Sequence, residues 1–233
     1  MAGGGSRVGR RLLVGLVILL LVLLGVDRLG DYVAEQAAAS TIKSSQGLAH
    51  KPGVDISGFP FLTQLASGSF DEITITAKDV PVGTADHQLD IGQVRVVLHE
   101  LTVSRDFKRV HAATANATAT VSYAALGQTL GLTVSYSGDG RITASRQVTV
   151  AGVTLNASLT TRPELVNGAL SFTQTAINNG AQLGGEITTL LNQAVGLAIP
   201  LQGIPFHVQV TTLKVDSGGL SIGLVGRDLS YSR

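Results

Sequence analysis

Apolar and polar residues alternate along most of the chain after residue 50, as expected for strands with one buried face. Ile73, Ile75 and Ala77 share one side of the first such row, with polar residues between them. Further rows of this kind occur at 130–136, 148–159, 206–210 and 220–224. Gly-rich turns at 138–140 and 216–219 separate neighbouring rows, which indicates an antiparallel meander rather than βαβ units. The pattern predicts about eight to ten strands.

Two segments have helical spacing instead. Leu29, Val33 and Ala37 recur every four positions between Val26 and about Ser45, which predicts the buried face of a helix that ends near Gly47. The polar residues expected on its other side are Asp31, Glu35 and Gln36.

A second amphipathic helix is predicted from about Gln182 to Ala198, before Pro200. Its expected apolar face consists of Leu183, Ile187, Leu190, Leu191 and Val195, and we assign no binding role to Ile187. Strands and helices together predict an α+β fold, with a curved antiparallel sheet and two amphipathic helices.

The segment from Ala113 to Tyr123 predicts a strand with one face of unusually small residues. Its odd positions are Ala113, Ala115, Ala117, Ala119, Val121 and Tyr123. A row of alanines leaves space above a sheet, and an empty apolar space would forfeit packing energy. Either a helix lies close over this face, or the face lines a groove for an acyl chain.

The N-terminus has the pattern of an export signal. Three arginines within residues 1–11 precede fifteen residues without a polar side chain, Leu12 to Val26. The run is short for a membrane-spanning helix, and the small residues Ala37–Ala39 follow at some distance. A retained signal-anchor and a cleaved signal peptide both remain open. We therefore divide the chain into a leader, 1–26, and one exported domain, 27–233.

Composition narrows the function classes. The chain is 44% hydrophobic and only 14% charged, which excludes intrinsic disorder. Lys and Arg are not concentrated and only 4% of the residues are aromatic, which argues against a nucleic-acid binder. Of the 17 Lys and Arg, three lie in the leader, so 14 remain against 16 acidic residues and the exported part carries a net charge of −2. The absence of cysteine excludes disulfides, Cys-ligated metals and thiol catalysis. The low charge indicates a large apolar interior.

Catalytic and metal-binding patterns are weak. The five histidines show no metal-ligand spacing. Gly219-Leu220-Ser221-Ile222-Gly223 matches a hydrolase pattern, but it lies in an alternating row rather than at a strand-to-helix turn. We predict no enzymatic activity, no metal and no cofactor.

Two surface segments are candidates for lipid contact. Pro60-Phe61-Leu62 predicts an uncharged loop that either touches a membrane, gates a groove or plugs the core. Arg105, Lys108 and Arg109 lie in a charged segment that also contains Phe107 and His111. This segment is either a solvated hairpin loop or a site for anionic lipid headgroups.

Three motifs together resemble the LmeA-like phospholipid-binding proteins of the actinobacterial cell envelope. They are Gly58-Phe59-Pro60-Phe61-Leu62-Thr63-Gln64-Leu65 followed by Gly68–Ile73, then Ser122-Tyr123-Ala124-Ala125-Leu126, and finally Ile199–Phe206 with Asp216–Leu220 and Gly226–Asp228. The resemblance covers roughly residues 29–231, and Gln202-Gly203 departs from the expected Leu-Pro-rich run. It implies a sheet wrapped around two helices with an apolar groove or tunnel, similar to tubular lipid-binding domains.

The expected function is that of a periplasmic phospholipid-binding protein that supports lipid or lipoglycan assembly. The expected partners are phospholipid, the membrane surface and an envelope glycosyltransferase, without nucleic acid. The alternative is a structural module that docks an envelope enzyme. The residues expected to contact acyl chains are Phe59, Phe61, Leu62, Leu65, Ala115, Ala117, Ala119, Val121 and Tyr123, and those expected at the headgroup are Arg105, Lys108 and Arg109.

Overall fold

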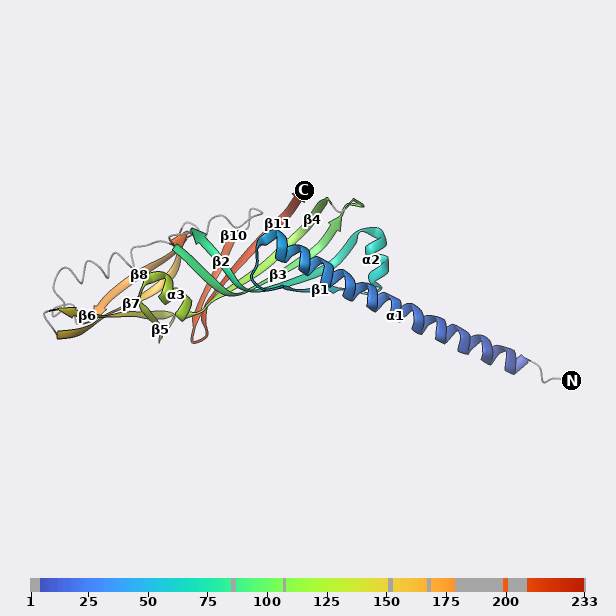
Figure 1. The fold of residues 1–233 in the computed structure, drawn as a ribbon, viewed down its shortest axis with the longest axis horizontal. Helices are drawn as coiled ribbons and strands as arrows, with labels where there is room; N and C mark the ends of the chain where they lie inside the picture. Colours follow the sequence, from blue (N-terminus) through green and yellow to red (C-terminus); the bar gives the residue numbers. More distant parts are fainter. Residues whose placement is uncertain are drawn as a thin grey trace.

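The computed structural model describes residues 5–84, 87–106, 108–150, 153–166, 169–178, 199–200 and 209–232. Within these ranges there are three helices and eleven strands (Figure 1). The strands form two antiparallel sheets, neither of which closes into a barrel. The predicted α+β class with antiparallel sheets is confirmed. The strands exceed the predicted eight to ten and form two sheets instead of one.

The larger sheet has the strand order β1-β2-β3-β4-β11-β10. Its strands are Gly53–Ser57 (β1), Ser69–Thr84 (β2), His87–Val103 (β3), Arg109–Val121 (β4), Gly219–Ser232 (β11) and Gln209–Asp216 (β10). The smaller sheet has the order β5-β6-β7-β8-β9. Its strands are Thr133–Gly138 (β5), Arg141–Val150 (β6), Val153–Val166 (β7), Ala169–Asn178 (β8) and Ile199–Pro200 (β9). The predicted turns at 138–140 and 216–219 join β5 to β6 and β10 to β11.

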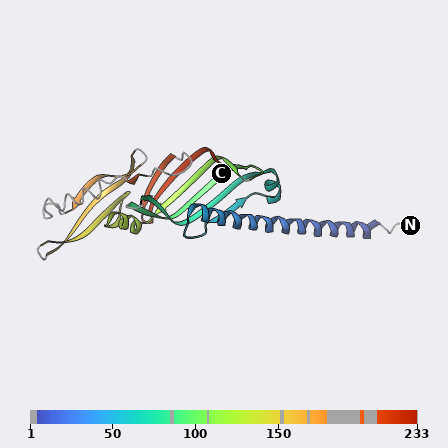
Figure 2. The same ribbon diagram turned by 45° about the horizontal axis from the view of Figure 1, so that its top comes forward.

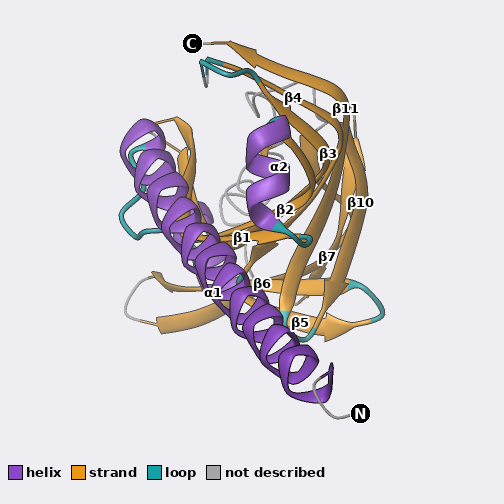
Figure 3. Ribbon diagram, turned by 90° about the vertical axis from the view of Figure 1, so that its right-hand side faces the viewer, coloured by secondary structure: helices purple, strands orange, loops and turns teal. Residues whose placement is uncertain are grey.

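The helices are Gly5–Gln46 (α1), Phe61–Ser67 (α2) and Tyr123–Leu130 (α3). Both α1 and α2 lie on the concave side of the larger sheet, and the N-terminal part of α1 extends well beyond the sheet (Figures 2 and 3). The sequence pattern did not predict α2 or α3. The helix predicted at 182–198 lies outside the described residues. Among the described residues the sheet does not wrap around α1, which lies mainly against β1 and α2, so the predicted wrap differs from the structure.

Helix α1 continues from the leader without a break and ends before Gly47, whose φ of 62° stops it where the sequence predicted. Its orientation is the reverse of the prediction. Leu29 and Val33 are 67% and 64% exposed, whereas Asp27 and Asp31 are buried. The docked face therefore combines small residues such as Ala34 and Ala39 with acidic ones, of which Asp27 and Glu35 accept hydrogen bonds from the backbone of the domain. Among the described residues, no helix combines the length and the apolar character needed to cross a membrane.

The predicted strand from Ala113 to Tyr123 is shifted in the structure. Strand β4 ends at Val121, and the Ser122 hydroxyl caps α3 by accepting a hydrogen bond from the Ala125 amide at 3.1 Å. Tyr123 is therefore the first residue of a helix. Leu130, which was predicted to begin the next strand, is instead the last residue of α3.

A crease across the larger sheet changes the phase of the alternation. The ladder skips one position on each of four adjacent strands: Asp71, Glu100, Ala113 and Asp228. Glu100 and Asp228 have φ values of 51° and 52°, which turn the backbone locally out of the extended region. Beyond the crease the inward position on β4 is Ala112, which is buried, and the prediction that Ala113 points inward is wrong.

The buried apolar residues form two separate clusters. The larger one, cluster 1, lies between the two sheets and α3 and includes Val121, Leu126 and Leu159. The smaller one, cluster 2, lies under α2 at the opposite end of the larger sheet and includes Phe61, Phe70 and Leu101.

Candidate functional site

An apolar strip on the concave face of the larger sheet lies between the two clusters. We call it the trough and define it by Ile75, Val94, Val96, Leu98 and Ala117. All five side chains are only partly buried. Strand register aligns them in rows, since Ile75 pairs with Val96 and Val96 pairs with Ala117. Half-buried aliphatic side chains aligned over three strands form a continuous apolar surface.

In the middle of the trough, β4 supplies only small side chains to the concave face. Ala115, Ala117 and Ala119 all point to the concave face, as the sequence predicted. The neighbouring strands carry larger residues, with Val96 on one side of Ala117 and Leu224 on the other. Ala115 and Ala119 are themselves buried, so Ala117 is the partly exposed small residue between these larger neighbours.

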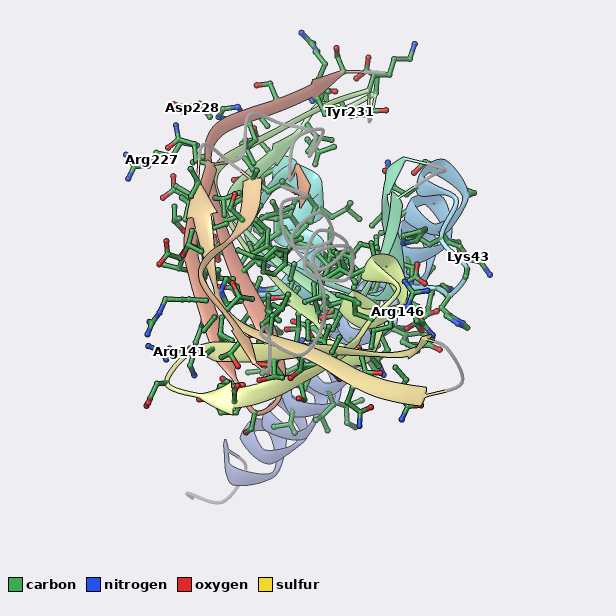
Figure 4. All side chains as sticks on the ribbon, turned by 90° about the vertical axis from the view of Figure 1, so that its left-hand side faces the viewer. Lys43, Arg141, Arg146, Arg227, Asp228 and Tyr231 are labelled. Atoms are coloured by element: carbon green, nitrogen blue, oxygen red, sulfur yellow. The ribbon has the colours of Figure 1, made fainter. Side chains whose placement is uncertain are left out.

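The convex face of the same strands is polar. Asn116 and Thr118 of β4 are exposed and alternate with the trough alanines. Arg227 of β11 projects away from the sheet on the side opposite to the helices (Figure 4). Only the concave face is therefore suited to an apolar ligand.

A carboxylate from α1 closes the end of the trough that lies under α2. The two Asp27 oxygens accept hydrogen bonds from the backbone amides of Phe61 and Leu62, at 3.0 and 2.9 Å. These amides belong to the first turn of α2, where no residue of the same helix can accept them. The N-cap residue of α2 is Pro60, whose side chain makes no cap bond. Asp27 therefore caps a helix from 34 residues away in sequence.

The contact between α1 and the domain extends for two further turns. Glu35 accepts a hydrogen bond from the Ile56 amide at 2.9 Å, and Gly30 packs closely under Phe61 and Leu62. Asp31 lies between these contacts and pairs with Arg28 at 3.5 Å, but its buried Oδ1 has no partner among the described residues. Burial raises the pKa of Asp31 above its usual value, and the nearby Arg28 opposes this shift.

The motif residues predicted to contact lipid take different places around α2. Phe61 is fully buried in cluster 2 and lies 6.4 Å from the ring of Phe70, so it fills the core. Phe59, Leu62 and Leu65 are large and apolar yet 60%, 39% and 39% exposed. The predicted uncharged loop thus becomes a short helix with one core anchor and an exposed apolar side.

Val121 and Tyr123 lie at the other end of the trough. Val121 is buried in cluster 1. The Tyr123 hydroxyl donates to the backbone carbonyls of Asp216 and Gly219, and its ring stacks on Tyr136 with centroids 6.4 Å apart. Burial raises the pKa of Tyr123, so the hydroxyl stays a donor. Tyr123 thus joins α3 to the β10–β11 turn.

The predicted headgroup residues lie on the β3–β4 hairpin, beside α2. Arg105, Lys108 and Arg109 are all exposed, and Phe107 lies outside the described residues. The Ser104 hydroxyl donates a hydrogen bond to Asp106 and lowers the pKa of that carboxyl. The Val103 amide donates to the Gly68 carbonyl at 2.7 Å, which ties this hairpin to the C-terminus of α2.

Two hollows with mixed polar and apolar linings lie outside the trough. One of about 350 Å³ is lined by residues of β1, β2 and β3 that include Asp55, Thr74 and Arg95. The other, of about 530 Å³, lies at the β4–β11 end, where Arg109 and His111 face Ser230 and Ser232. Ser221 of the hydrolase-like pattern is the third residue of β11 and pairs with Thr120 of β4 and Lys214 of β10, so it lies in a paired strand and not at the strand-to-helix turn that a nucleophile needs.

The fold and the trough define a protein with an apolar strip on one face of an open sheet. A model of the LmeA-like phospholipid-binding family matches residues 25–224. The chain belongs to this family, as its sequence motifs had indicated. A search of curated proteins found no match, and a search of solved structures found none.

Sequence reasoning missed the trough residues of β3 and the role of Asp27. Val94 and Val96 flank the polar Arg95, but Val97 lies between Val96 and Leu98, so period-two counting gives only a partial signal here. Asp27 gave no such signal, because its two hydrogen-bond donors lie in a segment that had been predicted as a loop.

Proposed function

We propose that this protein binds phospholipid by holding acyl chains along the trough. The observation that carries the proposal is the row of half-buried aliphatic side chains between clusters 1 and 2, over a strand of alanines. Each Å² of apolar surface removed from water contributes roughly 25 cal/mol, so an acyl chain needs no strong polar contact to bind. The protein is a carrier or sensor of lipid and not a catalyst.

The proposed location is outside the cytoplasmic membrane, with the N-terminal segment as the export signal. We further propose that this segment is retained. Cleavage near Ala37–Ala39 would remove Asp27 and Glu35, which bind the backbone of α2 and β1. It would also remove Ala34, which packs against cluster 2. The mass of the N-terminal peptide of the protein isolated from cells tests retention directly.

The wider role we propose is support of lipid or lipoglycan assembly in the cell envelope. The resemblance of the motifs to envelope lipid-binding proteins supports it. An envelope glycosyltransferase would be the partner that receives the lipid. Crosslinking in cells, followed by identification of the captured enzyme, tests this part separately.

Native mass spectrometry of the protein purified without added lipid tests binding. We expect bound phospholipid, and uptake of labelled phospholipid from liposomes. In the Ala117→Phe variant a large ring fills the trough, so both signals should fall several-fold while the unfolding midpoint changes little. The matched control is Thr118→Phe, which adds the same ring to the exposed convex face of the same strand. Lipid-free wild-type protein that takes up none would overturn the proposal, and a stoichiometric protein partner would then favour an interaction module.

A further inference from the structure

Exposed apolar side chains gather where α1 meets α2. From Leu16 to Val26, the large apolar side chains of α1 are between 43% and 62% exposed. Leu29 and Val33 extend this surface along the helix, and Phe59, Leu62 and Leu65 lie beside it on α2 and the preceding loop. A monomeric soluble protein rarely exposes so large a continuous apolar surface.

The contacts between α1 and α2 fix the position of α2 along the axis of α1, relative to the apolar run from Leu16 to Val26. Asp27, the residue after Val26, binds the first amides of α2, and Leu62 lies against Gly30. Val26 and Gly30 are four residues apart, which is about 6 Å along the helix axis. Helix α2 therefore begins about one helical turn from the end of the run. If the run enters a bilayer, α2 is held at the level of the headgroups, where amphipathic elements bury their apolar side by about 5–10 Å.

Cations lie on two sides of the same apolar side chains, and the exposed Asp71 is the acidic residue next to α2. The Arg28 guanidinium lies 5.4 Å from the centre of the Phe59 ring, and its side chain is still 56% exposed. The β3–β4 hairpin, which is tied to α2 through Gly68, presents Arg105, Lys108 and Arg109 to solvent. The one carboxylate of this hairpin, Asp106, is engaged by Ser104 and by the Lys108 amide. Exposed apolar side chains with cations beside them are complementary to an anionic bilayer surface.

We infer that the end of the larger sheet that carries α2 and the β3–β4 hairpin sits on an anionic phospholipid bilayer. Phe59, Leu62 and Leu65 enter the interface, and Arg28, Arg105 and Lys108 contact the phosphates. Cluster 2 lies between α2 and the trough, so the end of the trough that α2 closes faces the membrane. The inference deepens the proposed function, because it names the bilayer as the source of the lipid and α2 as the point of entry.

The absence of native cysteine allows a direct test by single-site labelling. Full-length Leu62→Cys protein carries an environment-sensitive fluorophore and is reconstituted in phosphatidylcholine vesicles with or without phosphatidylglycerol. A quencher on the lipid acyl chains reports proximity to the bilayer. The matched control is Ser217→Cys in the exposed β10–β11 turn, at the far end of β4 and so about 40 Å away along the strand.

We expect strong quenching at Leu62 and none at Ser217, with more quenching on vesicles that contain phosphatidylglycerol. Leu65→Cys serves as a second position, in case a label at Leu62 disturbs its contact with Gly30. The double variant Arg105→Glu/Lys108→Glu should lose the preference for anionic vesicles, since each removed cation weakens attraction about fivefold.

Equal signals at Leu62 and Ser217 would overturn the inference, as would a Leu62 label that crosslinks to a second copy and is shielded from the lipid quencher. Equal quenching on vesicles with and without phosphatidylglycerol would overturn the inference that the bound bilayer is anionic. Bound lipid is measured on the same samples. An unquenched label on a lipid-loaded protein removes the inference and leaves the proposed function, whereas a quenched label on a protein that never binds lipid removes the proposed function.

Discussion

The two ends of the larger sheet are closed in different ways. At one end, cluster 1 packs α3 and the smaller sheet on β3, β4 and β11 through aliphatic side chains such as Leu126 and Leu159. At the other end, cluster 2 is small, and α1 holds α2 in place through hydrogen bonds from backbone amides to Asp27. The trough lies between them.

The difference shows which end can open. Aliphatic packing spread over two sheets resists local separation, because every side chain that leaves the core leaves a cavity behind it. A closure that depends on one carboxylate and a seven-residue helix can open locally at a smaller cost. A ligand that enters the trough would therefore pass under α2 rather than through cluster 1. The following predictions test this contrast, from the largest expected effect to the smallest.

Truncation of cluster 1 should have the largest effect on stability. Leu159→Ala removes a fully buried side chain between the two sheets and should lower the free energy of unfolding by about 2–5 kcal/mol. Chemical denaturation measures the loss. The matched control is Val166→Ala on the same strand, where the side chain is 43% exposed and the expected loss is below about 0.5 kcal/mol. Similar losses for both would show that cluster 1 is not the main core.

Removal of the Asp27 carboxylate should open the other end locally. In Asp27→Ala the amides of Phe61 and Leu62 lose their acceptor, at a cost of about 1–3 kcal/mol. Hydrogen exchange at α2 should accelerate about 10- to 100-fold while exchange in cluster 1 is unchanged. Asp71→Ala, at an exposed carboxylate, is the control. Uniform acceleration across both ends would contradict independent closure.

The link at the Tyr123 end should contribute less. Tyr123→Phe keeps the stacked ring and removes the hydroxyl that donates to Asp216 and Gly219, at a cost of about 1 kcal/mol. Tyr136→Phe, which changes the partially exposed ring of the same stack, is the control. If the two variants have the same unfolding midpoint, the hydroxyl does not stabilise the β10–β11 turn.

The smallest effect concerns pH and Asp31. Because burial raises the pKa of this carboxyl in the folded state, folding favours its protonated form. Its stabilising contribution is thus present below the unfolded pKa and is lost as the pH rises through the folded pKa. Asp31→Asn should therefore stabilise the docked α1 at neutral pH, and the difference from wild type should shrink below about pH 4. Thermal unfolding measured against pH checks this, and a variant that is less stable at neutral pH would show that the Arg28 pair outweighs burial.

Local patterns in the sequence were sufficient for part of the fold and for the family. Alternation placed Ile73, Ile75 and the β4 alanines on one face, and Gly47 marked the end of α1. The same reasoning failed where a distant partner changed the meaning of a residue. It placed Leu29 and Val33 inward, because it could not know that Asp27 and Glu35 would meet the unpaired amides of α2 and β1.

The trough illustrates the same division. The run of alanines in β4 predicted a face with space above it, and the structure places Ala115, Ala117 and Ala119 there. The run did not predict that Ala113 would fall on the crease. A residue with left-handed backbone on one strand leaves an unpaired position on the strands beside it and so shifts their alternation. Which residues occupy these positions depends on the pairing between strands.

The sequence by itself therefore determined the apolar leader, the antiparallel α+β class, the low-charge interior and the family motifs. These depend on residues close together in the chain. Only the tertiary structure decided which side of α1 docks, that the Phe59–Leu65 motif forms a capped helix, and that two cores leave a trough between them. Each of these depends on hydrogen bonds or packing between segments far apart in sequence, and a local pattern carries no record of such partners.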